Sequence, residues 1–236
     1  KRALSLALAA IMLVGMMVVS ASAASYNDLT DKDQIVNKDA VSMLVSLGII
    51  EGKPDGSYAP TENVDRAQMA KMLSVIMNKG VDNSALYQSV NSGLVDVNTN
   101  WAKGHINYCY TTGIIAGRGN GKFDPSATVT ALEAAKMLLV AVGYDPAIEG
   151  FEGADWAINV SVRADEQGIF EGFTKDLSAP LNRDDAALLI YNALDVEMIQ
   201  SYTTNNYPIA YSDHRTILAD KYGVIKVEGV VTANEW

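Results

Sequence analysis

One segment of this chain recurs twice more, and that repetition restricts the fold more than any other feature. The clearest copy is Trp101–Met137. In each copy a Gly precedes an Ile and another large apolar residue, a second Gly follows four residues after the first, and a Pro follows twelve residues after it. These landmarks are Gly48, Gly52 and Pro60, then Gly113, Gly117 and Pro125, then Gly168, Gly172 and Pro180. Recurrence at fixed spacing is typical of repeat architectures.

Each copy predicts two helices joined by a Gly-rich loop. In the first copy, apolar residues at three- and four-residue intervals predict a helix over about Ile35–Leu47, which Gly48 ends. A second helix is expected over about Arg66–Asn78. In every copy the second helix starts with a capping signature. In the third copy this signature comes three residues closer to the first Gly than in the other two. The signatures are Asp65-x-x-Gln68, Thr130-x-x-Glu133 and Asn182-x-x-Asp185.

A single copy has too little apolar surface to fold alone, so the three are expected to share a core. The fold class is therefore mainly α: three helix-loop-helix repeats in one compact, three-lobed domain. The expected boundaries are residues 26–80, 92–143 and 151–196. Residues 197–236 are expected to hold a polar linker, a short helix over Thr216–Tyr222 and a β-prone stretch, Val224–Val231, that begins a further domain beyond Trp236.

The N-terminus has the pattern of an export signal. Lys1 and Arg2 precede an apolar run, Ala3–Val19, and small residues follow up to Ala24. This order of basic, apolar and small residues predicts a signal peptide, residues 1–23, cleaved after Ala23. The alternative is a retained N-terminal anchor helix. After cleavage no association with a membrane is expected.

Charge and composition exclude several kinds of chemistry. Without Lys1 and Arg2, 16 basic residues remain against 28 acidic ones, a net charge of −12 that opposes binding to nucleic acid. One Cys and two His leave little material for metal or nucleophile chemistry. Cys109 shares a helix column with Leu44 and Ala164 and is expected to be buried and inert. No cofactor is expected.

These motifs resemble the S-layer homology (SLH) family. The family pattern has an aromatic-x-Asp, a Trp-Ala pair, a Gly-Ile-Ile-x-Gly turn, a Gly-x-Phe-x-Pro loop and a Thr-Arg-Ala-Glu helix start. The second copy supplies Val95-Asp96, Trp101-Ala102, Gly113–Gly117 and Gly121–Pro125; the first supplies Tyr26-Asn27-Asp28, Gly48–Gly52, Gly56–Pro60 and Asp65–Gln68. The resemblance covers about residues 26–195.

The resemblance implies a pseudo-threefold trimer of repeats around a central helical bundle. It also implies an exported, non-enzymatic anchor, which holds a protein to the bacterial cell wall or S-layer by binding secondary cell wall polysaccharide, a peptidoglycan-associated glycan. The ligand implied is a pyruvylated amino-sugar cap in grooves between repeats, near the Arg of the helix start. A carboxylate there would meet free helix amides and an Arg fork.

The family's binding positions are transferred here one residue at a time. Arg66 and Arg183 match the family Arg, whereas the second copy has Ala131, so Arg118 is the expected substitute there. Asp65 and Thr130 match the capping position, where capping alone is the alternative role. Gln68, Glu133, Gly52 and Gly117 complete the expected ligand-binding set. Trp101 and Trp156 are expected to be core anchors at helix starts rather than sugar platforms.

Three other functions are weighed against anchoring. An enzyme has little support, because His105 aligns with Ala40 and Val160 in a helix column and no carboxylate pair is set apart by spacing. A calcium-loop module is disfavoured, because Lys53 and Pro54 stand where ligands are needed. The third is a self-assembling lattice protein with S-layer neighbours. The anchor of a surface hydrolase and that of a lattice protein would look alike in this stretch.

Overall fold

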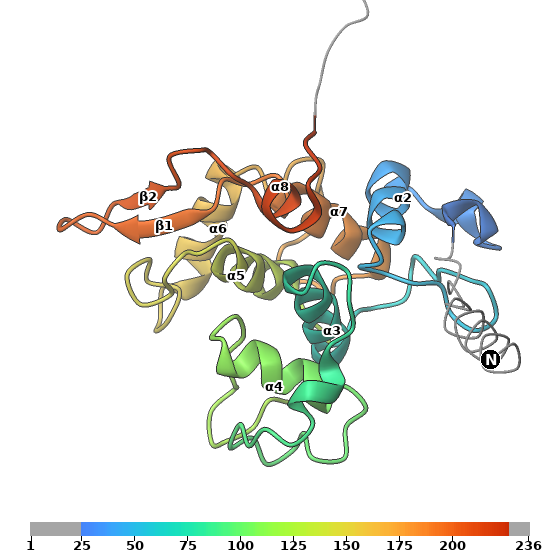
Figure 1. The fold of residues 1–236 in the computed structure, drawn as a ribbon, viewed down its shortest axis with the longest axis horizontal. Coiled ribbons are helices and arrows are strands. Elements are labelled where there is room, and N and C mark those ends of the chain that lie inside the picture. Colours follow the sequence, from blue (N-terminus) through green and yellow to red (C-terminus); the bar gives the residue numbers. More distant parts are fainter. Residues whose placement is uncertain (1–24, 227–236) are drawn as a thin grey trace, which may run out of the picture.

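The computed structural model describes residues 25–226, which are mainly helical (Figure 1). The predicted signal peptide, residues 1–23, lies outside the described residues. The α-helices are α2 (Lys38–Ser46), α3 (Arg66–Met77), α4 (Lys103–Thr111), α5 (Ala131–Ala141), α6 (Trp156–Glu166), α7 (Arg183–Ala193) and α8 (Ile217–Tyr222). Three 3-10 turns, η1 (Tyr26–Asp28), η2 (Lys32–Gln34) and η3 (Ser84–Tyr87), and two strands, β1 (Ile199–Tyr202) and β2 (Pro208–Ala210), complete the order. The longest of these helices has 12 residues, and within residues 25–226 none is long and apolar enough to cross a bilayer.

The second helix of each repeat begins where its capping signature predicts. Asp65 with Gln68 and Thr130 with Glu133 form complete capping boxes, in which side chain and backbone satisfy each other in both directions. Asn182 accepts from the amide of Asp185. Each cap satisfies amides that the first helical turn leaves without a partner.

The two helices of one repeat pack on other repeats instead of on each other. The first helix of each repeat lies against the second helix of the preceding one: α4 on α3 and α6 on α5, while α2 closes the circle on α7. The predicted helix-loop-helix repeat therefore does not fold back into a hairpin of its own. Loop 47–65 separates α2 from α3, so each helix is free to find its apolar partner in a neighbouring repeat.

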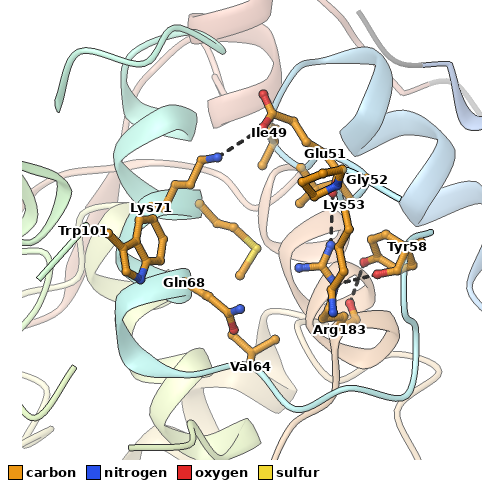
Figure 2. A pocket seen from close by; sticks show the side chains of 13 residues that line it. Ile49, Glu51, Gly52, Lys53, Tyr58, Val64, Gln68, Lys71, Trp101 and Arg183 are labelled. Atoms are coloured by element: carbon orange, nitrogen blue, oxygen red, sulfur yellow. Dashed lines mark hydrogen bonds and ion pairs between the residues drawn. The ribbon is translucent and has the colours of Figure 1, made fainter. Parts of the chain in front are cut away.

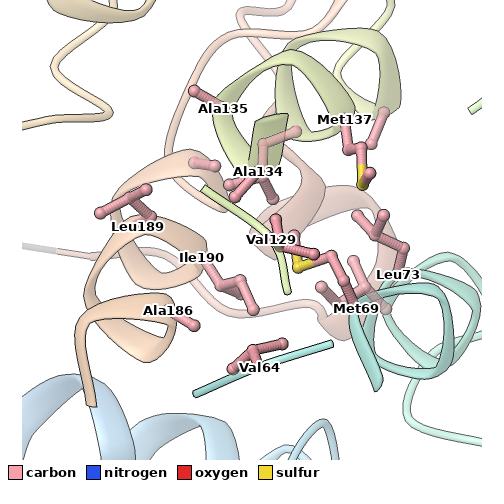
Figure 3. Packing of buried hydrophobic residues seen from close by; sticks show 14 of the residues in the cluster. Val64, Met69, Leu73, Val129, Ala134, Ala135, Met137, Ala186, Leu189 and Ile190 are labelled. Atoms are coloured by element: carbon pink, nitrogen blue, oxygen red, sulfur yellow. The ribbon is translucent and has the colours of Figure 1, made fainter. Parts of the chain in front are cut away.

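Side chains of the second helices α3, α5 and α7 contribute to one buried cluster (Figure 3). A ring of backbone hydrogen bonds between the segments that precede these helices joins the three repeats. The amide of Val64 donates to the carbonyl of Leu181 at 2.9 Å, Leu181 donates to Val129 at 2.8 Å, and Val129 donates to Val64 at 2.9 Å. All three side chains are buried. The surrounding core includes Met69, Leu73, Ala134, Ala135, Met137, Ala186, Leu189 and Ile190. Each repeat thus needs the other two, as expected for copies with a shared core.

Two sequence matches between the repeats are wrong. Pro60, Pro125 and Leu177 are the equivalent residues, because their carbonyls accept from Asp184, Ala67 and Leu132 in the same way. Pro180 lies three residues further on, since the loop of the third repeat is shorter. Likewise the residue of the first repeat that is equivalent to Asp96 is Asp31 and not Asp28. The Asp96 carboxylate accepts from the amides of Phe123 and Asp124, and the Asp31 carboxylate accepts in the same way from those of Tyr58 and Ala59.

The segment expected as a polar linker is folded onto the domain. Ile199–Tyr202 pairs antiparallel with Pro208–Ala210, and the Tyr202 hydroxyl donates to Glu149 at 3.0 Å. The predicted short helix is confirmed as α8, where Leu218 donates to the Leu194 carbonyl at 2.9 Å. Residues 224–226 have no regular structure, and the remainder of the predicted strand lies outside the described residues.

Candidate ligand-binding pockets

Two pockets lie where the repeats meet. The first, here called the α3 pocket, has a volume of about 250 Å³ and combines residues of all three repeats (Figure 2). The first repeat provides the loop after α2 and one face of α3, the second provides Trp101, and the third provides Arg183. Its lining is Ile49, Ile50, Glu51, Gly52, Lys53, Pro54, Tyr58, Val64, Gln68, Lys71, Met72, Trp101 and Arg183.

The second, here called the α5 pocket, has a volume of about 530 Å³. The second repeat provides the loop after α4 and one face of α5, the third provides Phe151–Gly153 and Trp156, and the first provides Arg66. Its lining is Arg66, Ile114, Ala116, Gly117, Arg118, Glu133, Lys136, Met137, Phe151, Glu152, Gly153 and Trp156.

The two pockets are built to the same plan. Nine lining positions of one correspond to nine of the other when the repeats are superposed by sequence. The corresponding pairs are Ile49 and Ile114, Glu51 and Ala116, Gly52 and Gly117, Lys53 and Arg118, Gln68 and Glu133, Lys71 and Lys136, Met72 and Met137, Trp101 and Trp156, and Arg183 and Arg66. Each pocket therefore has cations from three chain segments and one Trp around an apolar floor.

The Arg of each pocket, Arg66 or the half-buried Arg183, is fixed by the loop of the following repeat. Arg66 donates from Nε to the Phe123 carbonyl and from Nη2 to the Ala116 carbonyl, both at 2.8 Å, and lies 4.4 Å from the centre of the Phe123 ring. Arg183 makes the equivalent contacts with the first repeat. It donates from Nε to the Tyr58 carbonyl at 2.7 Å and from Nη2 to the Glu51 carbonyl at 3.1 Å, and it lies 4.7 Å from the centre of the Tyr58 ring. Within residues 25–226, Nη1 of either Arg has no hydrogen-bond acceptor, which leaves it available to a ligand.

This arrangement corrects the expectation about Ala131. The Arg that serves the second repeat's pocket is Arg66 of the first repeat, so the small residue at 131 does not impair it. Arg118, the expected substitute, also lines the α5 pocket, where it forms an ion pair with Glu133 at 2.8 Å. In the α3 pocket the equivalent Lys53 pairs with Glu62, and the amide of Gln68 takes the place of the Glu133 carboxylate.

Burial alters the cations of the α5 pocket. Only 4% of Arg66 is exposed, and burial lowers its pKa to about 10, with the positive charge of Arg118 acting in the same direction. Burial also lowers the pKa of Lys136, against the opposing effect of Glu152. Both side chains remain charged at neutral pH. Cations in such a partly dry site attract an anion more strongly than they would in water.

The two tryptophans differ: Trp156 packs against the core as the sequence suggested, whereas Trp101 does not. Trp101 is 58% exposed and lines the α3 pocket, so that expectation is wrong for it. Trp156 is half-buried and lies at the wall of the α5 pocket, where the Lys136 ammonium is 5.8 Å from its ring centre. An exposed indole beside cations offers the flat apolar face on which a sugar ring can stack.

The third junction, between the third and first repeats, has lost the same residues. Ala131 replaces the Arg, Leu188 replaces the Lys of α3 and α5, Val36 replaces the Trp, and Phe173 replaces the loop cation. The nearby Lys175 is paired with Asp185 at 2.5 Å. This junction therefore lacks the groups that make the other two suited to an anion.

Of the predicted binding residues, seven line the two pockets. These are Arg66, Arg118, Arg183, Gly52, Gly117, Gln68 and Glu133. Asp65 and Thr130 serve as helix caps and line neither pocket. Sequence reasoning missed Lys71 and Lys136, although both stand six residues after the capping residue and so share one position of the repeat. Within the described residues, no group of three or more His, Cys, Asp or Glu is placed to hold a metal ion.

Comparison with known proteins gives this architecture a family. Residues 25–70 and 95–135 match the model of the S-layer homology domain. The chain belongs to the SLH family. The third repeat, residues 151–196, lies outside the matched ranges.

Relatives of this SLH chain include lattice proteins and enzymes. The chain is 30% identical over 192 residues to the cell surface protein of Thermoanaerobacter kivui, an alignment that covers 81% of the chain and 24% of that protein. It is 32% identical over 111 residues to S-layer protein EA1 of Bacillus anthracis, covering 47% and 12%. It is 30% identical over 185 residues to an amylopullulanase of Thermoanaerobacterium thermosulfurigenes, covering 72% and 10%. The chain spans about a quarter or less of the length of these proteins.

SLH domains are non-catalytic regions that anchor proteins to the cell surface by binding cell wall polymers, and this chain is such a region. The amylopullulanase shows that an enzyme can have the same region.

Proposed function

We propose that the α3 and α5 pockets bind acidic sugar units of a secondary cell wall polysaccharide, and that a pyruvylated amino sugar is the unit bound. The observation that supports this most directly is the duplication of one pocket plan. Two sites share an Arg fixed by backbone carbonyls, a Lys, a Trp and a loop Gly, whereas the equivalent positions of the third junction have none of the Arg, Lys and Trp.

Each element of the plan matches one part of such a ligand. A ketal-linked pyruvate has a carboxylate, and the free Nη1 of the fixed Arg can bind it with a charge-assisted hydrogen bond. The Lys adds a second cation, and the Trp ring offers a stacking surface to the apolar face of the sugar. Gly117 has no Cβ, which would lie 2.8 Å from the Lys122 carbonyl oxygen, so this position keeps the loop tightly folded at the pocket wall.

The net negative charge of the chain does not oppose this proposal. Screening limits long-range repulsion to about 8 Å at physiological salt. Local contacts with the clustered cations therefore determine whether an anionic ligand binds.

We further propose that residues 151–196 are a third SLH repeat and that the three repeats form a pseudo-threefold trimer around α3, α5 and α7. The cyclic hydrogen bonds of Val64, Val129 and Leu181 and the circular order of helix packing support this. The third repeat supplies Arg183 and Trp156, so both pockets depend on it.

The protein to which this region belongs is proposed to be either a lattice protein or a surface enzyme. Relatives of both kinds share the region.

A pulldown with purified cell walls tests the polymer. The chain should sediment with intact walls and lose most of its binding after acid extraction removes the secondary polymer. Equal retention on the stripped peptidoglycan would contradict the proposal. A chain in which Arg66 and Arg183 are both replaced by Lys is the matched control, since it keeps the charge but loses the fork that fixes each side chain.

A further inference from the structure

His105 is a buried titratable residue that the binding proposal does not use. It lies on α4, only 3% exposed, where α4 packs against α3. The equivalent residues of the other repeats are Ala40 and Val160, so neither of the other copies has a titratable group in this column. The repeat does not need a His for packing, and this copy alone has one.

The imidazole has a polar partner on each side. Nδ1 lies 2.5 Å from the hydroxyl oxygen of Ser74 on α3, and Nε2 lies 3.6 Å from a carboxylate oxygen of Asp82 in the segment after α3. A neutral ring places its proton on Nε2, because a lone pair facing the Asp82 carboxylate would be repelled. Nδ1 then accepts from the Ser74 hydroxyl.

The same partners can accommodate a protonated ring. Nδ1–H would donate to the Ser74 oxygen, and the Ser74 proton would turn to the Lys71 carbonyl, which lies 3.1 Å away. Nε2–H would face Asp82 as an ion pair. Neither state leaves a buried polar atom without a partner, so the site can exist in both forms.

The ring also supports the α3 pocket. The centre of His105 is 6.4 Å from that of Trp101, with the two planes at 65°, so the imidazole packs edge-on against the tryptophan of the pocket. Ser74 is one helical turn from Lys71, the cation of the same pocket. His105 therefore packs directly against one pocket residue, Trp101, and is hydrogen-bonded to Ser74, which lies one turn from the other, Lys71.

We propose that His105 is a protonation-dependent positioning residue of the α3 pocket, and that an acidic ligand binds there more tightly when the ring is charged. This rests on the proposed function, because it presupposes that the pocket binds an anion. The positive charge would lie behind Trp101, close enough to attract the anion, while the ion pair with Asp82 would hold the ring in place. Binding and protonation then favour each other by the same factor.

The groups facing His105 determine when it becomes charged. Burial lowers its pKa, Asp82 opposes that effect, and the charge of Lys71 adds to it. Ser74 and Trp101 are neutral, and the Cys109 thiol on the same helix stays protonated because burial raises its pKa. An anion in the pocket offsets Lys71, so ligand binding should raise the pKa of His105.

The α5 pocket provides a control within the same molecule. Its Trp156 occupies the position of Trp101, but Val160 stands where His105 is. The indole N–H signals of Trp101 and Trp156 in a two-dimensional NMR spectrum therefore report the two pockets separately. The probe is the methyl glycoside of a pyruvylated amino sugar, titrated into the chain at about pH 4.5, well below the ordinary pKa of His, and at about pH 8.

The Trp101 signal should give a Kd that is about three- to tenfold lower at the acidic pH, and the Trp156 signal a Kd that changes less. His105→Gln, which keeps a polar side chain of similar length, should still bind but without the difference. If the variant does not fold, the wild-type ring decides: the probe should raise the pKa of His105, and an unchanged pKa would overturn its role.

Each other outcome has a definite meaning. A Trp101 Kd that is the same at both pH values, or a difference that persists in His105→Gln, would overturn the role of His105 alone. No binding at either Trp at any pH would instead remove the proposed function, and this inference with it.

Discussion

The guanidinium of Arg66 lies 4.4 Å from the ring centre of Phe123, a residue of the following repeat. Arg183 lies in the same way over Tyr58 at 4.7 Å, so in both pockets an Arg of one repeat completes the pocket of the next. Because a pocket takes its Arg from the preceding repeat, its binding residues cannot be identified from the sequence of a single repeat. Substituting one Arg should impair a pocket whose other residues lie far away in the chain.

Arg183→Ala should weaken ligand binding at the α3 pocket by about 1.5–3 kcal/mol, the usual value of a hydrogen bond to a charged group. The α5 pocket should keep its affinity, because Arg66 serves it. The two effects can be read from the separate indole signals of Trp101 and Trp156 during a titration. Arg163→Ala is the matched control, since Arg163 pairs with Glu149 and Glu166 and lines neither pocket. Equal loss at both pockets would contradict the assignment of one Arg to each pocket.

Binding to the α5 pocket should decline in alkaline solution. Burial lowers the pKa of Lys136 below its ordinary value and that of Arg66 to about 10. A cation with a lowered pKa is charged below that pKa and loses its charge as the pH rises through it. Affinity for an anion should therefore fall before the pH reaches the ordinary value for lysine of about 10.4.

Lys136→Arg tests the origin of that decline, because an Arg at this position stays charged to higher pH. Isothermal titration calorimetry between about pH 7 and about pH 10 should show a smaller loss of affinity in the variant than in the wild type. A decline of the same size in both proteins would mean that Lys136 does not contribute to binding.

Gly104 should be intolerant of any side chain. A Cβ at this position would lie 2.1 Å from the Ser84 carbonyl oxygen, which is backbone and cannot move aside cheaply. Gly104→Ala should therefore lower the free energy of unfolding by about 1–3 kcal/mol, as is usual for overpacking, even though Ala favours helix. Thermal unfolding followed by circular dichroism measures the change. The neighbouring Lys103→Ala is the control, and a Tm equal in the two variants would contradict the clash.

The elements of this fold could be predicted because their signals are local. Asp65 with Gln68 and Thr130 with Glu133 fixed the helix starts, since a capping box involves only four successive residues. The buried Cys109 followed from its helix column for the same reason. The segment after Met198 was misjudged because its polar residues pair in a hairpin whose stability depends on contacts with the domain, such as Tyr202 with Glu149.

The pockets were only half predictable, because their residues come together through contacts between repeats. Nothing in the order of the sequence says that Arg183 faces Tyr58, which lies 125 positions earlier. The exposure of Trp101 could not be predicted for the same reason. A Trp at a helix start is buried in many folds, and here the neighbouring repeat determines whether the ring is covered.

The chain should bind two ligands, one in each pocket, and none at the third junction. Ala131, Leu188 and Val36 replace the Arg, Lys and Trp there, and Lys175 is paired with Asp185, so within the described residues the junction has no free cation to compensate the desolvation of a carboxylate. Calorimetry with a pyruvylated amino sugar should give a stoichiometry near two, and Arg183→Ala should leave only the α5 event strong. Leu188→Lys, which restores one cation at the third junction, should leave the number at two, because Arg and Trp are still missing. A stoichiometry of three in the wild type would refute the division into two competent junctions and one that lacks the binding residues.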